Sequence, residues 1–423
     1  MRPPTLLALL VGAATGAGGL LQGLQWKKAA DTGLQEENAT RIRELESEIQ
    51  LLRSENDSLR SLAQGGGEIE VPTALEHYVE DALGLEFRSS PVVHRVAFEE
   101  LRGRVIASIE SRFPPNSLDH RQQAWRLMGL LGPDDLFAPQ LAATRSLGAR
   151  SWFDDQTGDG WVTDQYEPTS IPDQGALLRV LVRILLHQHY PPAPGYSGDE
   201  PDRSREALHH GTALALENRF LARQALGIGF TGSQNRNNDA GDLLASLPAY
   251  IRGLATFPSR VGLPFAERHL NRDALAPVLH SPPLLTAQLY PQPGETPIAL
   301  EFPELSGTLV LEESAGRLGL ELWLETLNPG DAPWLEPAAA WKGDRYRLVA
   351  RSDTQLDLDW EIELATPDAA TRVAEAGRIM AGFLAQSDTD PAEGETAIAP
   401  DGSRISVETP TPTRVRFTHH SPE

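Results

Sequence analysis

The organisation of this chain follows from the segment Gln174-Gly-Ala-Leu-Leu-Arg-Val-Leu-Val-Arg-Ile-Leu-Leu-His-Gln-His-Tyr190. On a helix, Arg179, Arg183 and His187 lie on one narrow polar stripe. Apolar side chains cover most of the remaining surface, so the helix is predicted to be buried on nearly all sides. A buried guanidinium group is costly unless a carboxylate pairs with it. The segment therefore predicts a group of ion pairs inside the protein.

A second long helix is predicted over Ser204–Gly227, after a loop rich in proline and glycine, Pro191–Arg203. Glu206, His210 and Glu217 recur at spacings of four and seven residues and share one face. We expect this face to meet the arginine stripe, so that a network of ion pairs joins the two helices. Loss of Arg183 from such a buried network is expected to cost about 3–5 kcal/mol. The alternative is an anion site in which the arginines bind a carboxylate or a phosphate.

The rest of the chain has a mixed pattern, and the predicted fold class is α+β. Further helices are predicted over Leu75–Leu83, Phe98–Phe113, Gln122–Leu131, Phe137–Leu147, Leu318–Leu327 and Pro367–Leu384. Strands are predicted over Val92–Val96, Thr308–Leu311, Tyr346–Arg351 and Leu356–Leu364. A hairpin is expected at Ser151–Thr163, and a last one is formed by Ile405–Val407 and Thr413–Thr418.

From about Thr73 to Leu384 the chain resembles a bacterial family of zinc metallopeptidases of the gluzincin type. Landmarks in the same order carry the resemblance: Leu83-Gly-Leu-Glu-Phe87, Phe113-Pro-Pro115, Met128-Gly-Leu-Leu-Gly-Pro133, Ser151-Trp-Phe-Asp-Asp155, Gln188-His-Tyr190, Ala207-Leu-His-His-Gly211, Ser281-Pro-Pro283, Leu318-Gly-Leu320 and Trp341-Lys-Gly-Asp-Arg-Tyr346. The resemblance implies a zincin-like fold, in which the Ser151–Asp155 segment forms the edge strand beside the active site.

The same resemblance places the family's functional residues at four positions that are changed here. Counting back from Gln188-His-Tyr190, the two zinc-binding histidines of the H-E-x-x-H motif fall at Arg179 and Arg183. The general-base glutamate falls at Val180, and the glutamate ligand of the next helix falls at His210. A guanidinium group has no electron pair to give to zinc, and valine cannot accept a proton from water. The resemblance therefore implies the fold but predicts an inactive site without metal.

Other possible sites are weaker. His187 and His189 are two residues apart on a helix and His209 and His210 are adjacent, so within each pair the side chains diverge. Metal binding by one histidine from each pair remains an alternative. Asp155–Gly160 looks like a calcium loop, but its twelfth position is Tyr166, where an EF-hand requires glutamate, so a turn is expected. Gly227–Gly232 spells GxGxxG after a helix rather than a strand, and we predict no cofactor.

Composition limits the classes of function. The chain has 423 residues and a formal net charge of −22, so its surface repels nucleic acid, and a polynucleotide partner is not expected. It contains no cysteine, which excludes disulfides, thiolate metal sites and a cysteine nucleophile.

The amino end predicts a membrane anchor. Thr5–Leu24 is uncharged and apolar, and Trp26, Lys27 and Lys28 follow it. About 20 helical residues span about 30 Å, the thickness of the hydrocarbon core of a bilayer. A cleaved signal peptide is the alternative. We place the anchor or signal segment at residues 1–30 and expect the globular domain on the outer face of a bacterial membrane.

A dimeric coiled coil is predicted after the anchor, at residues 31–66. Its heptads place isoleucine or asparagine at a positions and leucine at d positions, a pattern that favours a parallel dimer; these residues are Ile42, Leu45, Ile49, Leu52, Asn56 and Leu59. Gly65-Gly66-Gly67 uncouples this helix from the zincin-like domain, which is predicted at residues 67–385. Residues 386–423 are predicted to form an acidic linker followed by a terminal hairpin or tail.

Taken together, these patterns predict a membrane-anchored homodimer whose zincin-like domain has lost its enzymatic activity and binds or scaffolds a peptide or protein ligand. One alternative is a hydrolase with rebuilt chemistry, in which His209 or His210 works with Glu206 or Glu217. Another is a purely structural protein of the cell envelope.

Overall fold

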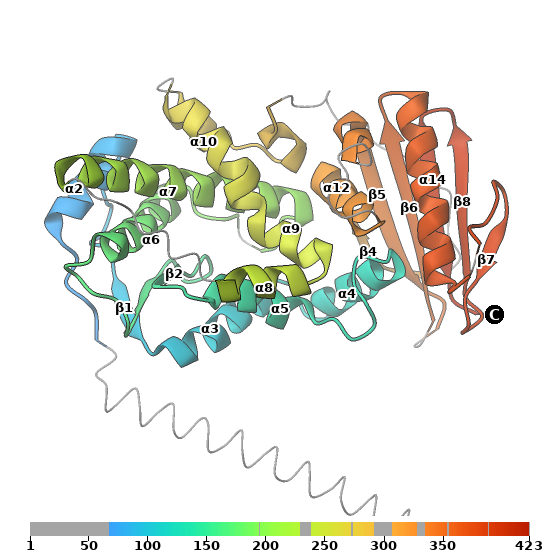
Figure 1. The fold of residues 1–423 in the computed structure, drawn as a ribbon, viewed down its shortest axis with the longest axis horizontal. Coiled ribbons are helices and arrows are strands. Elements are labelled where there is room, and N and C mark those ends of the chain that lie inside the picture. Colours follow the sequence, from blue (N-terminus) through green and yellow to red (C-terminus); the bar gives the residue numbers. More distant parts are fainter. Residues whose placement is uncertain are drawn as a thin grey trace, which may run out of the picture. The chain divides into compact units, whose positions relative to one another are not determined.

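Helices α6 (Ile171–His189) and α7 (Asp199–Ile228) pack side by side (Figure 1). The hydroxyl of Ser170 caps α6 by accepting a hydrogen bond from the backbone N–H of Asp173 at 3.4 Å. Pro172 stands in the first turn, where the missing N–H has no intrahelical partner to lose. Twelve residues of α6 are buried, Arg183 among them. The predicted burial of this helix on nearly all sides is confirmed.

The computed structural model describes residues 67–193, 195–228, 238–271, 274–291, 307–327, 335–352, 355–387 and 389–422. The predicted anchor Thr5–Leu24 and the predicted coiled coil lie outside these residues, as does most of the GxGxxG motif. Among the helices described, none combines the length and the apolar composition needed to span a membrane.

A small sheet lies against α6. Its strands are β1 (Val93–Val96), β2 (Ser151–Phe153) and β3 (Gly160–Thr163), in the order β1-β3-β2. β3 runs parallel to β1 and antiparallel to β2, so the predicted hairpin at Ser151–Thr163 is confirmed. A Cβ atom at Gly160 would overlap the side chain of Val180 on α6. Glycine at this position therefore lets the strand approach the helix closely.

The first half of the chain contributes four more helices: α2 (Thr73–Leu83), α3 (Phe98–Ser111), α4 (Ser117–Leu127) and α5 (Phe137–Ser146). Three of them fall where the sequence predicts helices. The fourth, α4, begins five residues before the predicted start and ends at Leu127 rather than at Leu131. Gly129 adopts a φ of 81°, the left-handed conformation that ends helices.

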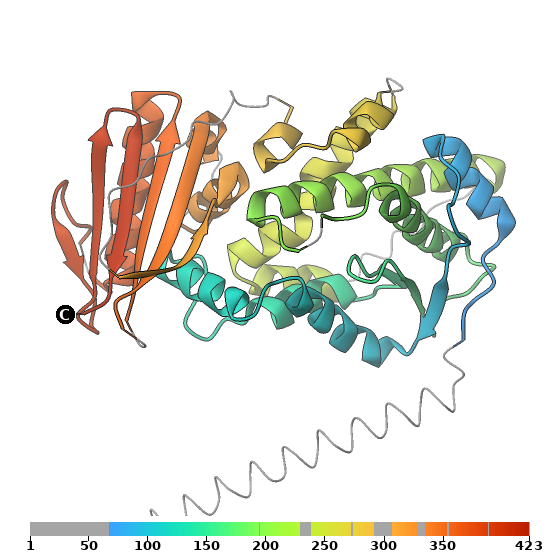
Figure 2. The ribbon, with the colours of Figure 1, turned by 180° about the vertical axis from the view of Figure 1, so that it is seen from behind.

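A second group of short helices follows α7 in the chain, and three of its members, Pro258–Gly262, Leu263–Leu270 and Thr286–Leu289, pack against α7 (Figure 2). They are α8 (Asn238–Ser246), α9 (Ala249–Phe257), the π-helical turn η1 (Pro258–Gly262), α10 (Leu263–Leu270), α11 (Leu275–His280) and the 3₁₀ turn η2 (Thr286–Leu289). The sequence patterns predict no element here, because each helix is too short to show a clear period. Together with α2–α7 and the small sheet they form the helical part, residues 67–291.

Two glycines allow α7 to cross η1 backbone to backbone. A Cβ at Gly211 would overlap the carbonyl group of Gly262, and a Cβ at Gly262 would overlap the carbonyl group of Ala207. Neither obstacle is a flexible side chain, so the helices themselves would have to move apart. Gly211→Ala is expected to lower the free energy of unfolding by about 1–3 kcal/mol, although alanine favours helix.

Chemical denaturation measures this effect, and Gly103→Ala in α3 is the matched control. A Cβ at Gly103 meets no atom within 4 Å, so this change is expected to stabilise the protein slightly. Equal stability of the Gly211→Ala and wild-type proteins would show that the crossing is not tight.

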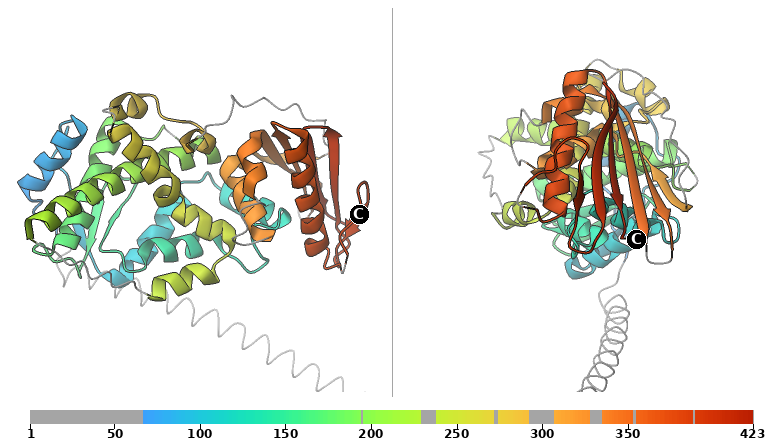
Figure 3. Two further views of the ribbon diagram at one scale, coloured as in Figure 1. Left: turned by 45° about the horizontal axis from the view of Figure 1, so that its top comes forward. Right: turned by 90° about the vertical axis from the view of Figure 1, so that its right-hand side faces the viewer.

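The sheet part, residues 307–422, is built on six antiparallel strands in the order β4-β5-β6-β9-β8-β7 (Figure 3). The strands are β4 (Thr308–Glu313), β5 (Trp341–Ala350), β6 (Leu356–Leu364), β7 (Thr396–Ile398), β8 (Arg404–Thr411) and β9 (Arg414–His420). Helices α12 (Gly316–Leu327) and α14 (Pro367–Leu384) cover one face, and the 3₁₀ turn η3 (Glu336–Ala340) precedes β5. Trp323, Trp360 and Phe417 meet edge to face beneath these helices.

Successive side chains of β6 point to opposite faces of this sheet. Leu358, Trp360 and Ile362 point into the core, while the intervening carboxylates lie on the other face. There Asp359 pairs with arginines of both neighbouring strands, Arg347 at 3.3 Å and Arg416 at 2.7 Å. Cross-strand ion pairs thus occupy the face that the helices leave uncovered.

The carboxyl end belongs to the same compact unit, Gly67–Glu423. Strand β9 pairs with β6 and inserts between β6 and β8. The structure therefore extends the globular unit beyond the boundary predicted at residue 385. The hairpin predicted from Ile405–Val407 and Thr413–Thr418 exists, but it completes the sheet. The chain is an α+β protein, as predicted.

Candidate functional site

Arg183 lies on the buried side of α6 and forms an ion pair with Asp155. The distance between the guanidinium and the carboxylate is 2.7 Å, and 8% of the Arg183 side chain is exposed. Arg179, one turn earlier, pairs with Glu217 of α7 at 3.2 Å and is about one-third exposed, at 32%. Val180 packs against Gly160 of β3. One of the predicted pairs between the arginine stripe and α7 is therefore present, but Arg183 finds its partner on the hairpin.

Asp155 forms ion pairs with three arginines that come from different parts of the chain. Arg183 of α6, Arg112 next to the end of α3 and Arg205 of α7 lie 2.7, 3.4 and 3.8 Å from its carboxylate. Burial opposes the charged form, but the three cations outweigh it and hold the pKa of Asp155 far below its usual range. The carboxylate is therefore charged at all ordinary pH values. The three arginines already occupy this carboxylate, which agrees with the expected turn rather than with a calcium loop.

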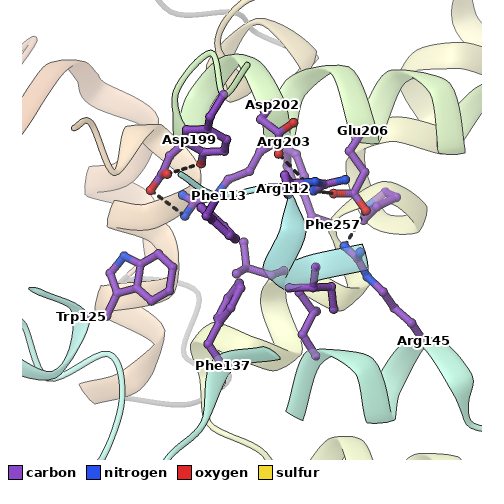
Figure 4. A pocket seen from close by; sticks show the side chains of 15 residues that line it. Arg112, Phe113, Trp125, Phe137, Arg145, Asp199, Asp202, Arg203, Glu206 and Phe257 are labelled. Atoms are coloured by element: carbon purple, nitrogen blue, oxygen red, sulfur yellow. Dashed lines mark hydrogen bonds and ion pairs between the residues drawn. The ribbon is translucent and has the colours of Figure 1, made fainter. Parts of the chain in front are cut away.

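Glu206 continues the ion pairs along α7 (Figure 4). It binds Arg112 at 3.2 Å and Arg145 of α5 at 2.5 Å. Although burial favours the neutral form, Arg145 and Arg112 lower the pKa of Glu206 to about 2. Asp202, one turn earlier, binds Arg112 at 3.0 Å and Arg205 at 3.7 Å. We call the connected set the charge network; it consists of Arg112, Arg145, Asp155, Arg183, Asp202, Arg205 and Glu206.

The histidines that the sequence singles out have separate contacts, although His187 lies close enough to His209 to help lower its pKa. His187 packs edge to face on Phe153, with ring centroids 5.7 Å apart, and the Nε2 atom of His189 lies 2.8 Å from the carbonyl oxygen of Glu86. Burial and the nearby arginines lower the pKa values of His209 and His210 to about 3. Both histidines are therefore neutral at physiological pH.

The positions that hold zinc in the resembling family do not suit zinc here. A guanidinium–carboxylate pair stands at the second of them, and Val180 is buried in the core. Within the described residues, no group of three or more histidine, aspartate or glutamate side chains is arranged to hold a metal ion. Glu206 and Glu217, the suggested acids of a rebuilt hydrolase, are each paired with arginine.

Strand β2 presents a free edge next to the charge network. Backbone hydrogen bonds join Arg150 to Thr163 and Asp154 to Asp159 across the hairpin. Since bonding alternates along an antiparallel pair, the N–H and C=O groups of Ser151 and Phe153 point away from β3. In the described part of the chain, β2 ends the order of its sheet. Asp155 follows the end of β2 by two residues, so the unpaired edge of this strand leads to the charge network.

A second cluster, which we call the Asp199 hub, lies at the start of α7. Asp199 is 1% exposed and binds Arg121 of α4 at 2.8 Å and Arg203 at 3.2 Å. The hydroxyls of Tyr196 and Tyr346 donate to the same carboxylate. Glu313 at the end of β4 binds Arg121 and accepts from the backbone N–H of Asp199. The hub thus connects the helical part with the sheet part.

Comparison of the chain with protein-family models, with curated proteins and with solved structures gives no match. The assignment of a function therefore depends on the geometry just described.

Arg183→Ala is expected to lower the free energy of unfolding by about 1.5–3 kcal/mol, the value of a hydrogen bond to a charged group. This is less than expected for an isolated buried pair, because Asp155 keeps Arg112 and Arg205. Arg179→Ala on the same helix removes a partly exposed pair and should cost less than about 1 kcal/mol. Urea denaturation compares the two variants; equal losses would contradict the assigned burial of Arg183.

Proposed function

We propose that this chain is a non-catalytic binding protein, and that its globular domain is a zincin-like domain whose metal site has been replaced by ion pairs. The observation that carries this proposal is the pair between Arg183, at the position of a zinc-binding histidine, and Asp155, directly after the edge strand. A metal-binding helix and an edge strand face each other in a zincin. Here the ion pair of Arg183 with Asp155 joins α6 to the turn that follows β2.

The ligand that fits this arrangement is an extended peptide. The outward N–H and C=O groups of Ser151 and Phe153 can pair with a peptide backbone, as in recognition by strand addition. β2 is held in place by α6, because the hydroxyl of Ser151 donates to the carbonyl oxygen of Ala176 at 2.7 Å. A rigid edge of this kind binds without first having to become ordered.

The amino-terminal segments fit such a role. We propose that Thr5–Leu24 anchors the chain in a membrane, with the domain on the outer face, and that Ile42, Leu45, Ile49, Leu52, Asn56 and Leu59 form the core of a parallel homodimer. Two domains on one stalk would bind a repeated or dimeric partner more tightly than either domain alone.

Peptide selection tests the binding role. A random peptide library displayed on phage is selected on the immobilised full chain, and the affinity of enriched peptides is measured by calorimetry. Ser151→Pro removes the outward N–H, whereas Ser151→Ala removes only the hydroxyl and is the matched control. We expect Ser151→Pro to weaken binding at least tenfold. Ser151→Ala loses the hydrogen bond to Ala176 but keeps the outward N–H group, so it should weaken binding much less. Failure to enrich any peptide, or equal binding by both variants, would contradict strand addition.

Metal reconstitution tests the zincin-like assignment. The combined variant Arg179→His, Val180→Glu, Arg183→His and His210→Glu restores the four family residues. We expect it to bind one Zn²⁺ per chain in a metal titration, whereas the wild-type chain should bind none at that site. A folded variant without zinc affinity would show that these positions do not form a zincin site.

A further inference from the structure

One face of the small sheet carries a row of aromatic side chains. The backbone register pairs His94 of β1 with Trp161 of β3, and the same Trp161 with Trp152 of β2. Residues that are directly opposed in neighbouring strands point to the same face of a sheet. The three side chains therefore form one row across the sheet, in which the ring centroids of His94 and Trp161 lie 4.7 Å apart. We call His94, Trp161 and Trp152 the aromatic row.

The aromatic row lies on the face of the sheet that points away from α6. A Cβ atom at Gly160 would overlap Val180 of α6. The hydroxyl of Ser151 donates to a backbone carbonyl group of α6, and the ring of Phe153 packs against His187 of the same helix. Since successive side chains of a strand alternate between the two faces, the row points the other way. Each of its three side chains is partly exposed.

The two ends of the aromatic row differ. At the β1 end the chain itself covers the edge of the sheet, because backbone hydrogen bonds of 2.8 and 3.2 Å join residues 67–69 to β1 and place Glu68 opposite His94. At the β2 end the row stops at Trp152, and in the part of the chain that the structure describes this strand ends the order of its sheet. A strand added to β2 would therefore extend the row by one position beyond Trp152.

Trp152 is the member of the row that an added strand would contact. Trp161 lies one strand further in, and the guanidinium group of Arg104 covers its ring at 4.3 Å from the centroid. Ser151 and Phe153 direct their backbone groups outward, so Trp152 between them would face the peptide at a position without backbone hydrogen bonds. Opposed Cα atoms at such positions are about 4.5 Å apart, rather than about 5.5 Å, which brings the side chains close together.

We propose that the peptide bound at the β2 edge carries an aromatic residue opposite Trp152. This preference rests on the proposed function, because it needs a peptide added to β2, and it names the class of peptide. In an antiparallel peptide, the two residues that flank the aromatic one would exchange backbone hydrogen bonds with Ser151 and Phe153. Burial of the peptide's ring against Trp152 is expected to strengthen binding at least tenfold.

The peptides enriched on the full chain test this preference. We expect them to share one position occupied by phenylalanine, tyrosine or tryptophan, and calorimetry should show at least tenfold weaker binding when alanine replaces that residue. A photoreactive benzoylphenylalanine at the same position should crosslink to β2. Peptides that depend on the edge, as the Ser151→Pro variant reports, but tolerate alanine at every aromatic position would overturn the preference and leave strand addition intact. If no peptide is enriched, both proposals fail.

A double-mutant cycle tests the contact with Trp152. Trp152→Val removes the ring but keeps an apolar residue that favours strands. Phe383→Val is the control, because Phe383 of α14 is an aromatic side chain of the sheet part that is 69% exposed. The alanine replacement in the peptide should weaken binding less than threefold in Trp152→Val, but at least tenfold in Phe383→Val. Equal losses in the wild-type protein and in Trp152→Val would overturn the contact.

The crosslink also decides the matter if Trp152→Val does not fold, because it uses the wild-type chain. Labelling of β2 by the benzoylphenylalanine peptide would support the contact. Labelling confined to residues outside β2 would overturn it.

Discussion

Asp199→Ala is expected to lower the free energy of unfolding by about 3–5 kcal/mol, because it leaves buried cations without their anion. Only 2% of the Arg121 side chain and 1% of Asp199 are exposed, so water cannot replace the lost carboxylate. Arg203 and the hydroxyls of Tyr196 and Tyr346 lose the same acceptor. Arg121 keeps only Glu313 as an anionic partner.

Denaturation in urea at pH 7 measures this loss, and Asp202→Ala is the matched control. Asp202 lies one turn further along α7, but its partners Arg112 and Arg205 keep Asp155, and Arg112 also keeps Glu206. The control should therefore cost less than about 1.5 kcal/mol. Hydrogen exchange in β4 and β5 should accelerate in Asp199→Ala, because the hub connects these strands to α7. Similar losses in the two variants would show that water enters the hub.

Sequence patterns were sufficient for the local elements of the helical part. The period of apolar residues in Gln174–Tyr190 identifies α6 and its burial, and the glycine-containing turn identifies the β2–β3 hairpin. Such features depend on residues close in the chain. The fold class α+β follows from the same local signals.

The start of α7 could not be read from the sequence in this way. Pro201 and the glycines before it indicate a loop up to Arg203, yet the helix begins at Asp199. Proline is compatible with a first helical turn, because its missing N–H would have no intrahelical partner there. Because the helix begins at Asp199, its first two turns supply residues to both clusters. Asp199 and Arg203 belong to the hub, and Asp202 and Glu206 belong to the charge network. The prediction thus left out the first five residues of α7, which include Asp199 of the hub and Asp202 of the charge network.

Contacts between residues that are distant in the sequence also could not be predicted from local patterns. Spacing shows that Arg183 needs an anion, but it does not show that Asp155 of the hairpin is nearer than Glu206. Similarly, nothing in the terminal segment indicates that β9 inserts between β6 and β8. Both depend on tertiary packing, which a single pattern does not encode.

Glu200→Gln is expected to stabilise the protein at pH 8, although it removes a charge from a helix start, where charge is usually favourable. Glu200 is 2% exposed. Its carboxyl group accepts from the backbone N–H of Thr286 at 2.9 Å and contacts the Thr286 hydroxyl at 3.0 Å. Burial raises its pKa to about 8, against the smaller opposing effect of Arg203. Glutamine keeps the shape and the acceptor and needs no proton.

The sign of the pH dependence follows from proton binding. The folded pKa of Glu200 is about 8, and the unfolded value is about 4.3. Between these values the folded state holds a proton that the unfolded state has lost, so stability falls as the pH rises from about 4.3 to about 8. At pH 8 the accumulated loss is on the order of 4–5 kcal/mol. Glu200→Gln should recover most of it.

Unfolding midpoints at pH 6.5, 7.2 and 8 are the measurement, with Glu206→Gln as the matched control on the same helix. The pKa of Glu206 is lowered to about 2, so its charged form stabilises the fold above pH 4.3 and its loss should destabilise the protein. His209 and His210, whose folded pKa values are about 3, titrate near pH 6.5 in the unfolded state and add a slope of their own there. The wild-type protein and both variants share this slope, so it cancels when each variant is compared with the wild-type protein at the same pH. We therefore expect Glu200→Gln to raise the midpoint increasingly with pH and Glu206→Gln to lower it. If Glu200→Gln lowers the midpoint at pH 8, the carboxyl group is charged in the folded protein and a cation or water must reach it.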